Sequence, residues 1–363
     1  MARVSNLRWL PLLLLSALCL FSNATPLATR QPMCTDFTIP VTIHAQNQDL
    51  SVVTAPTFNI TVDGTFNIFA RYCEPQVNLP YHGDILQFLV HGLTYTNKYW
   101  TADGWDRNSW VSWASVSGYP TLAIDCLGSG NSSHPDPNLV VQMQAQVETL
   151  HRILTLIRST NSPLPRRYNK IIYAGHSYGS LLGNALVTKY PTDVNVLVLT
   201  GYSSSLVTSI NATLLPAQIT NPSKFGSLPP EYLQFADKEG FRDTFYHVND
   251  YSEDIFELDY SLQGTMATGE VATITQGLVV ASGFTGPVYV VTGKYDTLFC
   301  NSGGAVDCGT NTAGFLPNTR QLFPAANPFD VAVLDNAGHC WLMHYAGIIG
   351  VVKVMGWLTT VGY

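Results

Sequence analysis

Residues 170–190 read KIIYAGHSYGSLLGNALVTKY. An apolar, β-branched run is followed at once by a run with helical spacing that begins at Tyr178. Ser177 stands between the two runs, with Gly175 and Gly179 on either side. Glycine at these positions permits a tight strand-to-helix turn and close packing of the helix on the strand. The stretch therefore predicts a serine nucleophile at the top of a parallel sheet.

Strand and helix patterns alternate along most of the chain. Alternating runs near the start predict half-buried strands, and continuous apolar runs predict buried parallel strands. The predicted strands cover residues 40–46, 64–73, 85–92, 119–128, 170–177, 194–201, 286–296 and 329–339, and the predicted helices cover residues 106–118, 138–160, 178–191 and 343–358. This order predicts an α/β fold with a mostly parallel, doubly wound sheet.

Residues 202–285 interrupt the alternation. They are rich in Tyr, Phe, Asp, Pro and Gly, and their helical patterns are short. An insertion between core strands is expected to cover the end of the sheet where ligands bind. We therefore divide the chain into an N-terminal segment (1–24), a first core part (25–201), a cap (202–285) and a second core part (286–363).

The N-terminal segment has the pattern of a secretory signal peptide. Two arginines precede an apolar run from Trp9 to Phe21, and small residues follow up to Ala24. The run is shorter than the about 20 residues that span a membrane comfortably. We expect cleavage after Ala24, an extracellular protein without a membrane span, and glycosylation at the sequons of Asn59, Asn131 and Asn211.

Secretion changes what the cysteines predict. Six of the seven remain after cleavage, and an even number in an oxidising compartment indicates disulfides. One pair brackets a glycine-rich loop, and a second pair flanks early strands. The third pair can form only if the loops that carry its two cysteines meet. The expected pairs are Cys300–Cys308, Cys34–Cys73 and Cys126–Cys340, one of about 15 possible sets.

Composition excludes some partners. The formal net charge is −7, and such a surface repels phosphate backbones, so no nucleic-acid partner is expected. No cysteine or histidine cluster has zinc spacing, so we predict neither a metal nor another cofactor. The oligomeric state stays open.

A serine hydroxyl is a weak nucleophile and needs a base. His339, in DNAGHCW, follows the last predicted strand, where a loop histidine can reach Ser177. His344 is the nearest rival, but it falls inside the final predicted helix, which favours a packing or supporting role. His176 flanks the serine and is expected to be structural.

The base needs an acid that orients it. Asp296, in VVTGKYDTLF, follows a strand between the serine and the histidine in sequence. Asp307 competes with it in the same loop. Asp335 lies at the end of the last strand, too near His339 in sequence to orient it easily. The predicted catalytic residues are therefore Ser177, Asp296 and His339.

The developing oxyanion needs backbone N–H donors. One is expected from Tyr178, the residue after the nucleophile, and the other from Leu93, in the loop HGLTYTNKYW that follows a buried strand. His91 and Gly92 shape the end of that strand.

The motifs of this chain, in the order in which they occur, resemble those of the α/β-hydrolase superfamily. GHSYG, the HG that precedes Trp100, DCLGSGNSS, GKYD and AGH cover roughly residues 80–360. HGLTYTNKYW is similar to the HG-x7-W pattern of dehalogenase- and epoxide-hydrolase-like members. DCLGSGNSS resembles the family's D-x-x-G-x-G-x-S loop, and GHCWLMHY resembles the ending of secreted fungal hydrolases. The loop positions are Asp125, Gly128, Gly130 and Ser132.

The resemblance implies acyl chemistry, because dehalogenases and epoxide hydrolases carry an aspartate where this chain has Ser177. We expect hydrolysis of an ester or lactone of a moderately bulky hydrophobic molecule. An acyltransferase, cyclase or peptidase of the same fold is the alternative, and a non-catalytic binding protein is another. Aromatic residues of the cap either line a pocket or pack the cap's own core. They are Tyr202, Phe225, Tyr232, Phe235, Phe241, Phe245, Tyr246, Tyr251, Phe256 and Tyr260.

Overall fold

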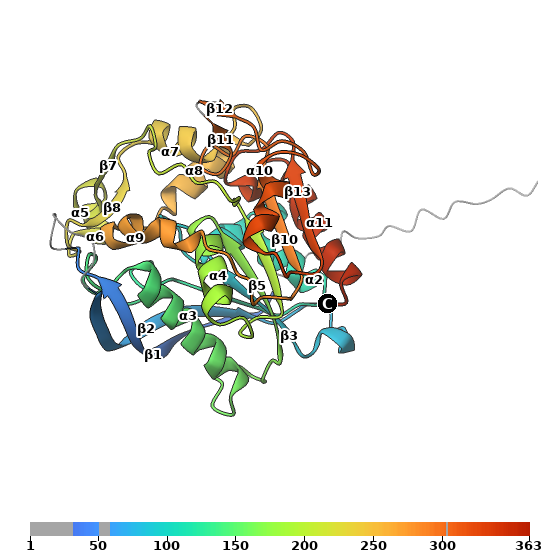
Figure 1. Ribbon diagram of the computed structural model, residues 1–363. Helices are drawn as coiled ribbons and strands as arrows, with labels where there is room; N and C mark the ends of the chain where they lie inside the picture. The colour runs from blue at the N-terminus through green and yellow to red at the C-terminus, as the bar shows by residue number, and fades with distance from the viewer. Residues whose placement is uncertain (1–31, 51–58, 303) are drawn as a thin grey trace, which may run out of the picture. The chain divides into compact units, whose positions relative to one another are not determined.

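The computed structural model describes residues 32–50, 59–302 and 304–363 (Figure 1). The predicted signal segment at residues 1–24 lies outside these ranges. An eight-stranded sheet forms the centre of the described chain, in the order β1-β2-β4-β3-β5-β6-β10-β13. Its strands are β1 (Cys34–Gln48), β2 (Asn59–Cys73), β3 (Ile85–Val90), β4 (Thr121–Ile124), β5 (Lys170–His176), β6 (Val196–Thr200), β10 (Val288–Gly293) and β13 (Phe329–Leu334).

Most of this sheet is parallel. β1 pairs antiparallel with β2, and β2 pairs antiparallel with β4. From β4 to β13 every neighbouring pair is parallel. The predicted α/β fold with a mostly parallel sheet is therefore confirmed.

Helices cover both faces of the sheet, as the alternation within β3 shows. Leu86, Phe88 and Val90 belong to one hydrophobic cluster, which also holds residues of α3 and α4. Ile85 and Leu89 belong to the other, which holds residues of α2 and α11. This alternation follows from the two-residue period of a strand. The helices are α2 (Trp110–Val116), α3 (Met143–Arg158), α4 (Tyr178–Lys189) and α11 (Gly347–Thr360). Within the described ranges, no helix is long and apolar enough to cross a membrane.

The helix expected at residues 138–160 differs from its predicted boundary. The helix α3 begins only at Met143. Asp136 explains the delay, because its side chain accepts from the N–H groups of Asn138 and Leu139. Such a local side-chain bond offers the backbone an alternative to the helix.

The cap, residues 202–285, forms a small layer of its own. Its three-stranded sheet has the order β7-β8-β9, and short helices surround it. In Figure 1 these yellow and orange elements lie beyond the carboxyl ends of β5 and β10. The cap contains β7 (Leu214–Pro216), α5 (Ala217–Thr220), α6 (Pro222–Phe225), β8 (Tyr232–Phe235), α7 (Lys238–Phe245), α8 (Glu253–Ser261), β9 (Met266–Ala267) and α9 (Thr268–Thr273).

Two of the three expected disulfides are present, Cys34–Cys73 and Cys300–Cys308. The third is wrong, because Cys126 and Cys340 are both free and buried. Cys340 Sγ lies 3.5 Å from Nε2 of His176, at the end of β5. Cys126 follows β4, and β3 lies between β4 and β5. Two strand spacings amount to about 10 Å, whereas a disulfide requires Cα atoms within about 7 Å.

Candidate active site

Ser177 occupies a sharp turn between β5 and α4. Its backbone has φ 54° and ψ −117°, a conformation that residues with a Cβ rarely adopt. The flanking glycines make the turn possible. A Cβ on Gly175 would lie 2.5 Å from the Gly179 carbonyl oxygen, and a Cβ on Gly179 would overlap the carbonyl oxygen of Val90. The predicted strand–serine–helix turn is therefore present.

The structure brings His339 and Asp296 together. Nδ1 of His339 lies 3.0 Å from both carboxylate oxygens of Asp296, and both side chains are fully buried. Asp296 follows β10, and His339 follows β13, the neighbouring strand. The adjacent parallel strands therefore place an acid and a base at the same edge of the sheet.

Asp296 is surrounded by donors. The Thr292 hydroxyl donates at 2.6 Å, and the N–H groups of Leu298 and Phe299 donate at 3.0 Å each. Burial alone would raise the pKa of Asp296. The His339 imidazole and these donors outweigh burial, so the pKa lies below its ordinary value. The carboxylate is therefore ionised at neutral pH. Sequence analysis missed Thr292, which lies on β10, four residues before Asp296 in the chain.

The rejected acids lie elsewhere. Asp307 and Asp335 are exposed. Asp307 accepts from the N–H of Gly309 within its own loop. Neither carboxylate is among the partners of His339 in the described chain, which agrees with the preference for Asp296.

His344 supports the loop that carries His339. The sequence predicts His344 inside the final helix, but in the structure it precedes α11. Its Nε2 accepts from the N–H groups of Gly338 and His247, at 3.1 and 3.0 Å, and Nδ1 faces the carbonyl oxygen of Cys340 at 3.0 Å. Burial lowers the pKa of His344 to about 4. The neutral ring therefore ties the His339 loop to the cap.

His176 is fully buried and is held by two neighbours. Its Nδ1 lies 3.1 Å from the Thr200 hydroxyl, and its ring stacks on Tyr99 with centroids 4.2 Å apart. Burial, with His339 and His91 nearby, lowers its pKa well below the ordinary value. The ring is therefore neutral at physiological pH.

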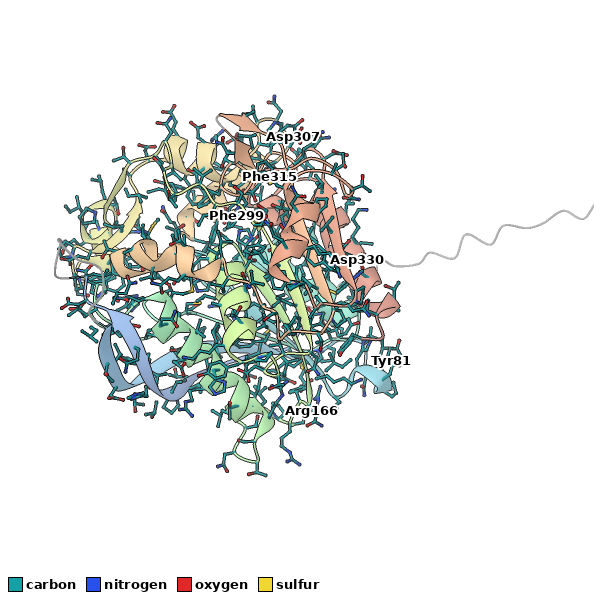
Figure 2. All side chains as sticks on the ribbon, viewed as in Figure 1. Tyr81, Arg166, Phe299, Asp307, Phe315 and Asp330 are labelled. Carbon is teal, nitrogen blue, oxygen red and sulfur yellow. A yellow bond between two sulfur atoms is a disulfide. The ribbon has the colours of Figure 1, made fainter. Side chains whose placement is uncertain are left out.

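His339 leaves one nitrogen available. Its Nε2 is buried and has no hydrogen-bond partner among the described residues, Ser177 included. Hydrogen bonds of catalytic groups are often long in unliganded enzymes and tighten with substrate. The rings of Phe245 and Phe299 lie nearly parallel to the imidazole, with centroids 5.6 and 5.7 Å away. Figure 2 shows Phe299 at the end of the sheet opposite Tyr81 and Arg166.

The two predicted oxyanion donors flank Ser177. The Tyr178 N–H stands at the start of α4, where a helix has no internal acceptor. Leu93 and Ser177 line the same cavity. A Cβ on Gly92 would lie 2.8 Å from the Ser177 Cβ, so the Leu93 loop passes directly beside the serine.

The residues around this loop are structural. His91 is buried, and its Nε2 accepts from the N–H of Cys126 at 3.0 Å. Asp125 accepts from the backbone N–H and the side-chain amide of Asn97, both at 2.7 Å, and from the N–H of Asn131 at 2.8 Å. A Cβ on Gly130 would overlap the Asp125 carboxylate. The aspartate–glycine loop thus fixes the segment that follows Leu93.

Ser177 opens into an apolar cavity of about 300 Å³. Fourteen apolar and four hydroxyl-bearing side chains line it, and none of these 18 residues is charged. Only Phe235 and Phe245 of the ten cap aromatics named above belong to the lining. Others, such as Phe241, Tyr246 and Phe256, pack against one another in the core cluster that also holds residues of α2 and α11. The cavity wall is therefore mainly aliphatic.

Comparison with known proteins gives a family and a fold. The model of the alpha/beta hydrolase family matches residues 87–350. No curated protein matches the chain significantly. Among solved structures, an esterase from Thermogutta terrifontis aligns with a TM-score of 0.54 and 13% identity, over 89% of this chain and 99% of that one. A monoacylglycerol lipase from Paleococcus ferrophilus aligns with a TM-score of 0.53 and 15% identity, over 81% and 98%. At such identities the likeness establishes the fold.

Proposed function

The chain belongs to the alpha/beta hydrolase family, and from this membership and the site geometry we propose that it is a serine hydrolase. It cleaves a carboxylic ester or lactone of a moderately bulky hydrophobic small molecule through an acyl-enzyme. The observation that carries the proposal is the position of Ser177 on the wall of an apolar cavity, in a turn flanked by the start of α4 and the Leu93 loop.

The proposed reaction uses the groups in known roles. His339 Nε2 takes the hydroxyl proton as Ser177 Oγ attacks the carbonyl carbon, and Asp296 stabilises the imidazolium. The N–H groups of Leu93 and Tyr178 bind the oxyanion. His339 then gives the proton to the leaving alcohol. A water molecule attacks the acyl-enzyme in the same way and releases the acid.

The cavity favours a short to medium apolar group. Its volume lies at the lower end of the about 300–1,000 Å³ typical of ligand pockets. The hydroxyls of Thr208, Thr244 and Thr275 are the polar groups that line it besides Ser177. A charged group would lose its hydration there without gaining a partner.

A series of p-nitrophenyl esters tests this proposal. We expect kcat/KM to rise from acetate to a medium-chain ester and to fall for palmitate, with no turnover by Ser177→Ala. Ala272→Phe, on the cavity wall, should reduce turnover of the longer esters more than that of acetate. Val280→Phe, on an exposed part of the cap away from the cavity, is the matched control. No ester turnover by the folded protein would contradict the proposal, and transfer of the acyl group to an added alcohol in preference to water would favour an acyltransferase.

Secretion is part of the proposal. It is supported by the signal-peptide pattern before Thr25 and by two disulfides, which persist in oxidising compartments. Asn131 and Asn211 are exposed and accessible to glycosylation. N-terminal sequencing of the protein from its native source should begin at Thr25. Recovery of the intact N-terminus from the cytosol would contradict secretion.

A further inference from the structure

The cap is bonded to the loop that carries the Leu93 donor. Thr94 has φ 62°, in the left-handed region that residues with a Cβ rarely adopt. Both of its backbone groups pair with the cap: its N–H donates to the Thr265 carbonyl at 3.2 Å, and its carbonyl accepts from the Gly264 N–H at 2.7 Å. The cap therefore holds the residue next to the oxyanion donor in an unusual conformation.

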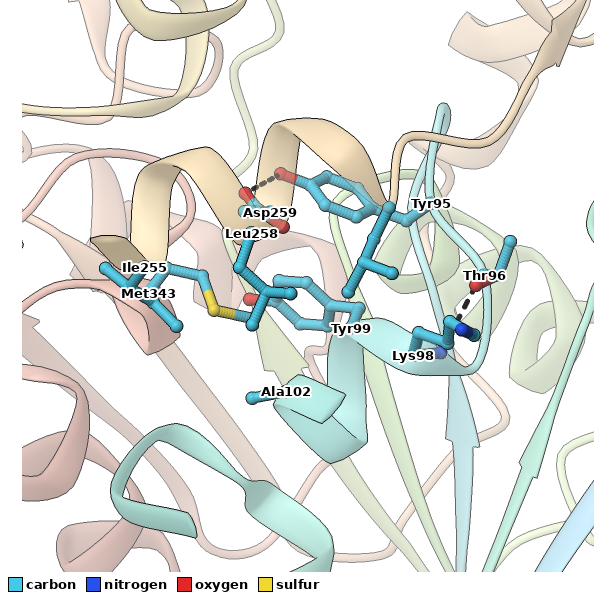
Figure 3. A pocket seen from close by; sticks show the side chains of 10 residues that line it. Tyr95, Thr96, Lys98, Tyr99, Ala102, Ile255, Leu258, Asp259 and Met343 are labelled. Carbon is cyan, nitrogen blue, oxygen red and sulfur yellow. Dashed lines mark hydrogen bonds between the residues drawn. The ribbon is translucent and has the colours of Figure 1, made fainter. Parts of the chain in front are cut away.

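A buried carboxylate makes a second connection. Asp259, on α8 of the cap, is 4% exposed. Its Oδ2 accepts from the Tyr95 hydroxyl at 3.0 Å, drawn in Figure 3, and from the Tyr246 hydroxyl at 2.6 Å. Burial raises the pKa of Asp259 to about 6, and the two phenol donors limit the rise, so the group is ionised at pH 7. Tyr95 thus donates a charge-assisted hydrogen bond to the cap.

The seam between α8 and this loop is closely packed. The void left there measures about 10 Å³, roughly the space for one water molecule. In Figure 3 its walls come from α8 on one side and from the loop and α1 (Lys98–Thr101) on the other. They include Tyr95, Tyr99, Ile255, Leu258, Asp259 and Met343. Tyr95 is therefore fixed by packing as well as by hydrogen bonds.

The same hydroxyl contacts the loop that carries His339. The Tyr95 oxygen lies 3.0 Å from Sγ of Cys340, the residue after His339. Cys340 in turn faces His176, the residue before Ser177. The Tyr95 hydroxyl is thus the point where the cap, the Leu93 loop and the His339 loop meet.

We propose that Asp259 is a positioning residue that acts through Tyr95, holding the Leu93 N–H where the oxyanion forms. The cap is then a fixed part of the catalytic apparatus in addition to the wall of the cavity. This inference rests on the proposed function. It has a clear energetic basis, because a small displacement of a positioned group can cost about 100-fold in rate.

Two tyrosine variants provide a matched test. Tyr95→Phe and Tyr246→Phe each remove one hydroxyl from the same carboxylate, but only Tyr95 belongs to the oxyanion loop. We expect Tyr95→Phe to lower kcat by about 10- to 100-fold with KM nearly unchanged, as for loss of a transition-state interaction. Tyr246→Phe should keep kcat within about twofold. Asp259→Asn, whose amide oxygen still accepts from Tyr95, should restore most of the kcat that Asp259→Leu loses.

Hydrogen exchange provides a readout that needs no activity. Amides of residues 92–97 should exchange faster in Tyr95→Phe than in Tyr246→Phe, while the core strands keep their protection. Wild-type kcat and unchanged exchange in Tyr95→Phe would overturn the inference, and so would an equal loss of kcat in Tyr246→Phe. A wild-type protein that neither forms an acyl-enzyme nor turns over esters would instead refute the proposed function. Hydrogen exchange would still decide whether the contact between Tyr95 and Asp259 holds the Leu93 loop.

Discussion

Asp296 in the core and Asp259 in the cap are both buried, with 0% and 4% of their surface exposed, yet their pKa values shift in opposite directions. Burial dominates at Asp259 and raises its pKa to about 6, because only two phenol hydroxyls oppose it. At Asp296 the same penalty is outweighed by His339, Thr292 and the Phe299 N–H, and the pKa falls below its ordinary value. The donors and charges around a buried carboxylate, more than burial itself, decide its protonation state.

The largest effect on activity is expected from neutralising the core carboxylate, Asp296. Asp296→Asn should lower kcat by about 10⁴-fold, because an amide allows the wrong tautomer of His339. Steady-state kinetics on the best ester measures this effect. Asp307→Asn and Asp335→Asn, which remove exposed carboxylates that lie between Asp296 and His339 in sequence, are the controls and should retain wild-type kcat. A comparable loss of kcat in either control would mean that Asp296 is not the acid that orients His339.

The pH dependence of stability sharpens the comparison. The folded-state pKa of Asp259 is raised from 3.8 to about 6, so its contribution to stability is fully present below pH 3.8 and is lost as pH rises through 6. The shift corresponds to about 3 kcal/mol. Relative to wild type, Asp259→Asn should therefore gain about 3 kcal/mol in unfolding free energy between pH 4 and 7.

Asp296→Asn should show the opposite trend in the same denaturant titrations. The lowered pKa of Asp296 gives stability above its unfolded pKa, which is lost as pH falls through the folded value. Parallel pH profiles for the two variants would contradict the contrast between the two carboxylates.

A smaller effect is expected from the disulfide beside Asp296. The Cys300 N–H donates to the Asp296 carbonyl, and Cys300 is bridged to Cys308, eight residues on. Closing a loop of this length stabilises by about 2.5 kcal/mol in the chain-entropy description. Replacing both cysteines by serine should lower stability by about that amount and reduce kcat less than tenfold, since Thr292 and Phe299 still hold the carboxylate.

The other disulfide provides the control for this prediction. Cys34 and Cys73 join β1 to β2 at the edge of the sheet far from β10. Their replacement should lower stability and leave kcat unchanged. A large loss of kcat from that variant would mean that stability alone controls the activity measured.

Local patterns in the sequence predicted much of the core. Gly175 and Gly179 indicated the turn at Ser177, and the order of strands along the chain placed Asp296 and His339 at the same sheet edge. These predictions succeed because consecutive parallel strands present their carboxyl ends on one side. Leu93 was predictable for the same reason, as the loop after β3 ends beside β5.

Features that depend on distant segments were not predictable. Tyr95 and Asp259 are 164 residues apart and meet only because α8 packs on the oxyanion loop. The pairing of Cys126 with Cys340 failed because the sequence does not reveal that Cys340 lies against His176 at the end of β5, with β3 between β5 and the strand that precedes Cys126. The cap aromatics show the same limit, since which of them face the cavity depends on how the short cap helices pack.

The central claim is that Ser177 is an activated nucleophile. Labelling the purified protein with a fluorophosphonate, followed by intact mass and peptide mapping, tests it most directly. We predict one adduct per chain, located on Ser177 and absent from Ser177→Ala. An adduct on a different residue, or none on folded protein that binds an apolar dye in the cavity, would contradict the account.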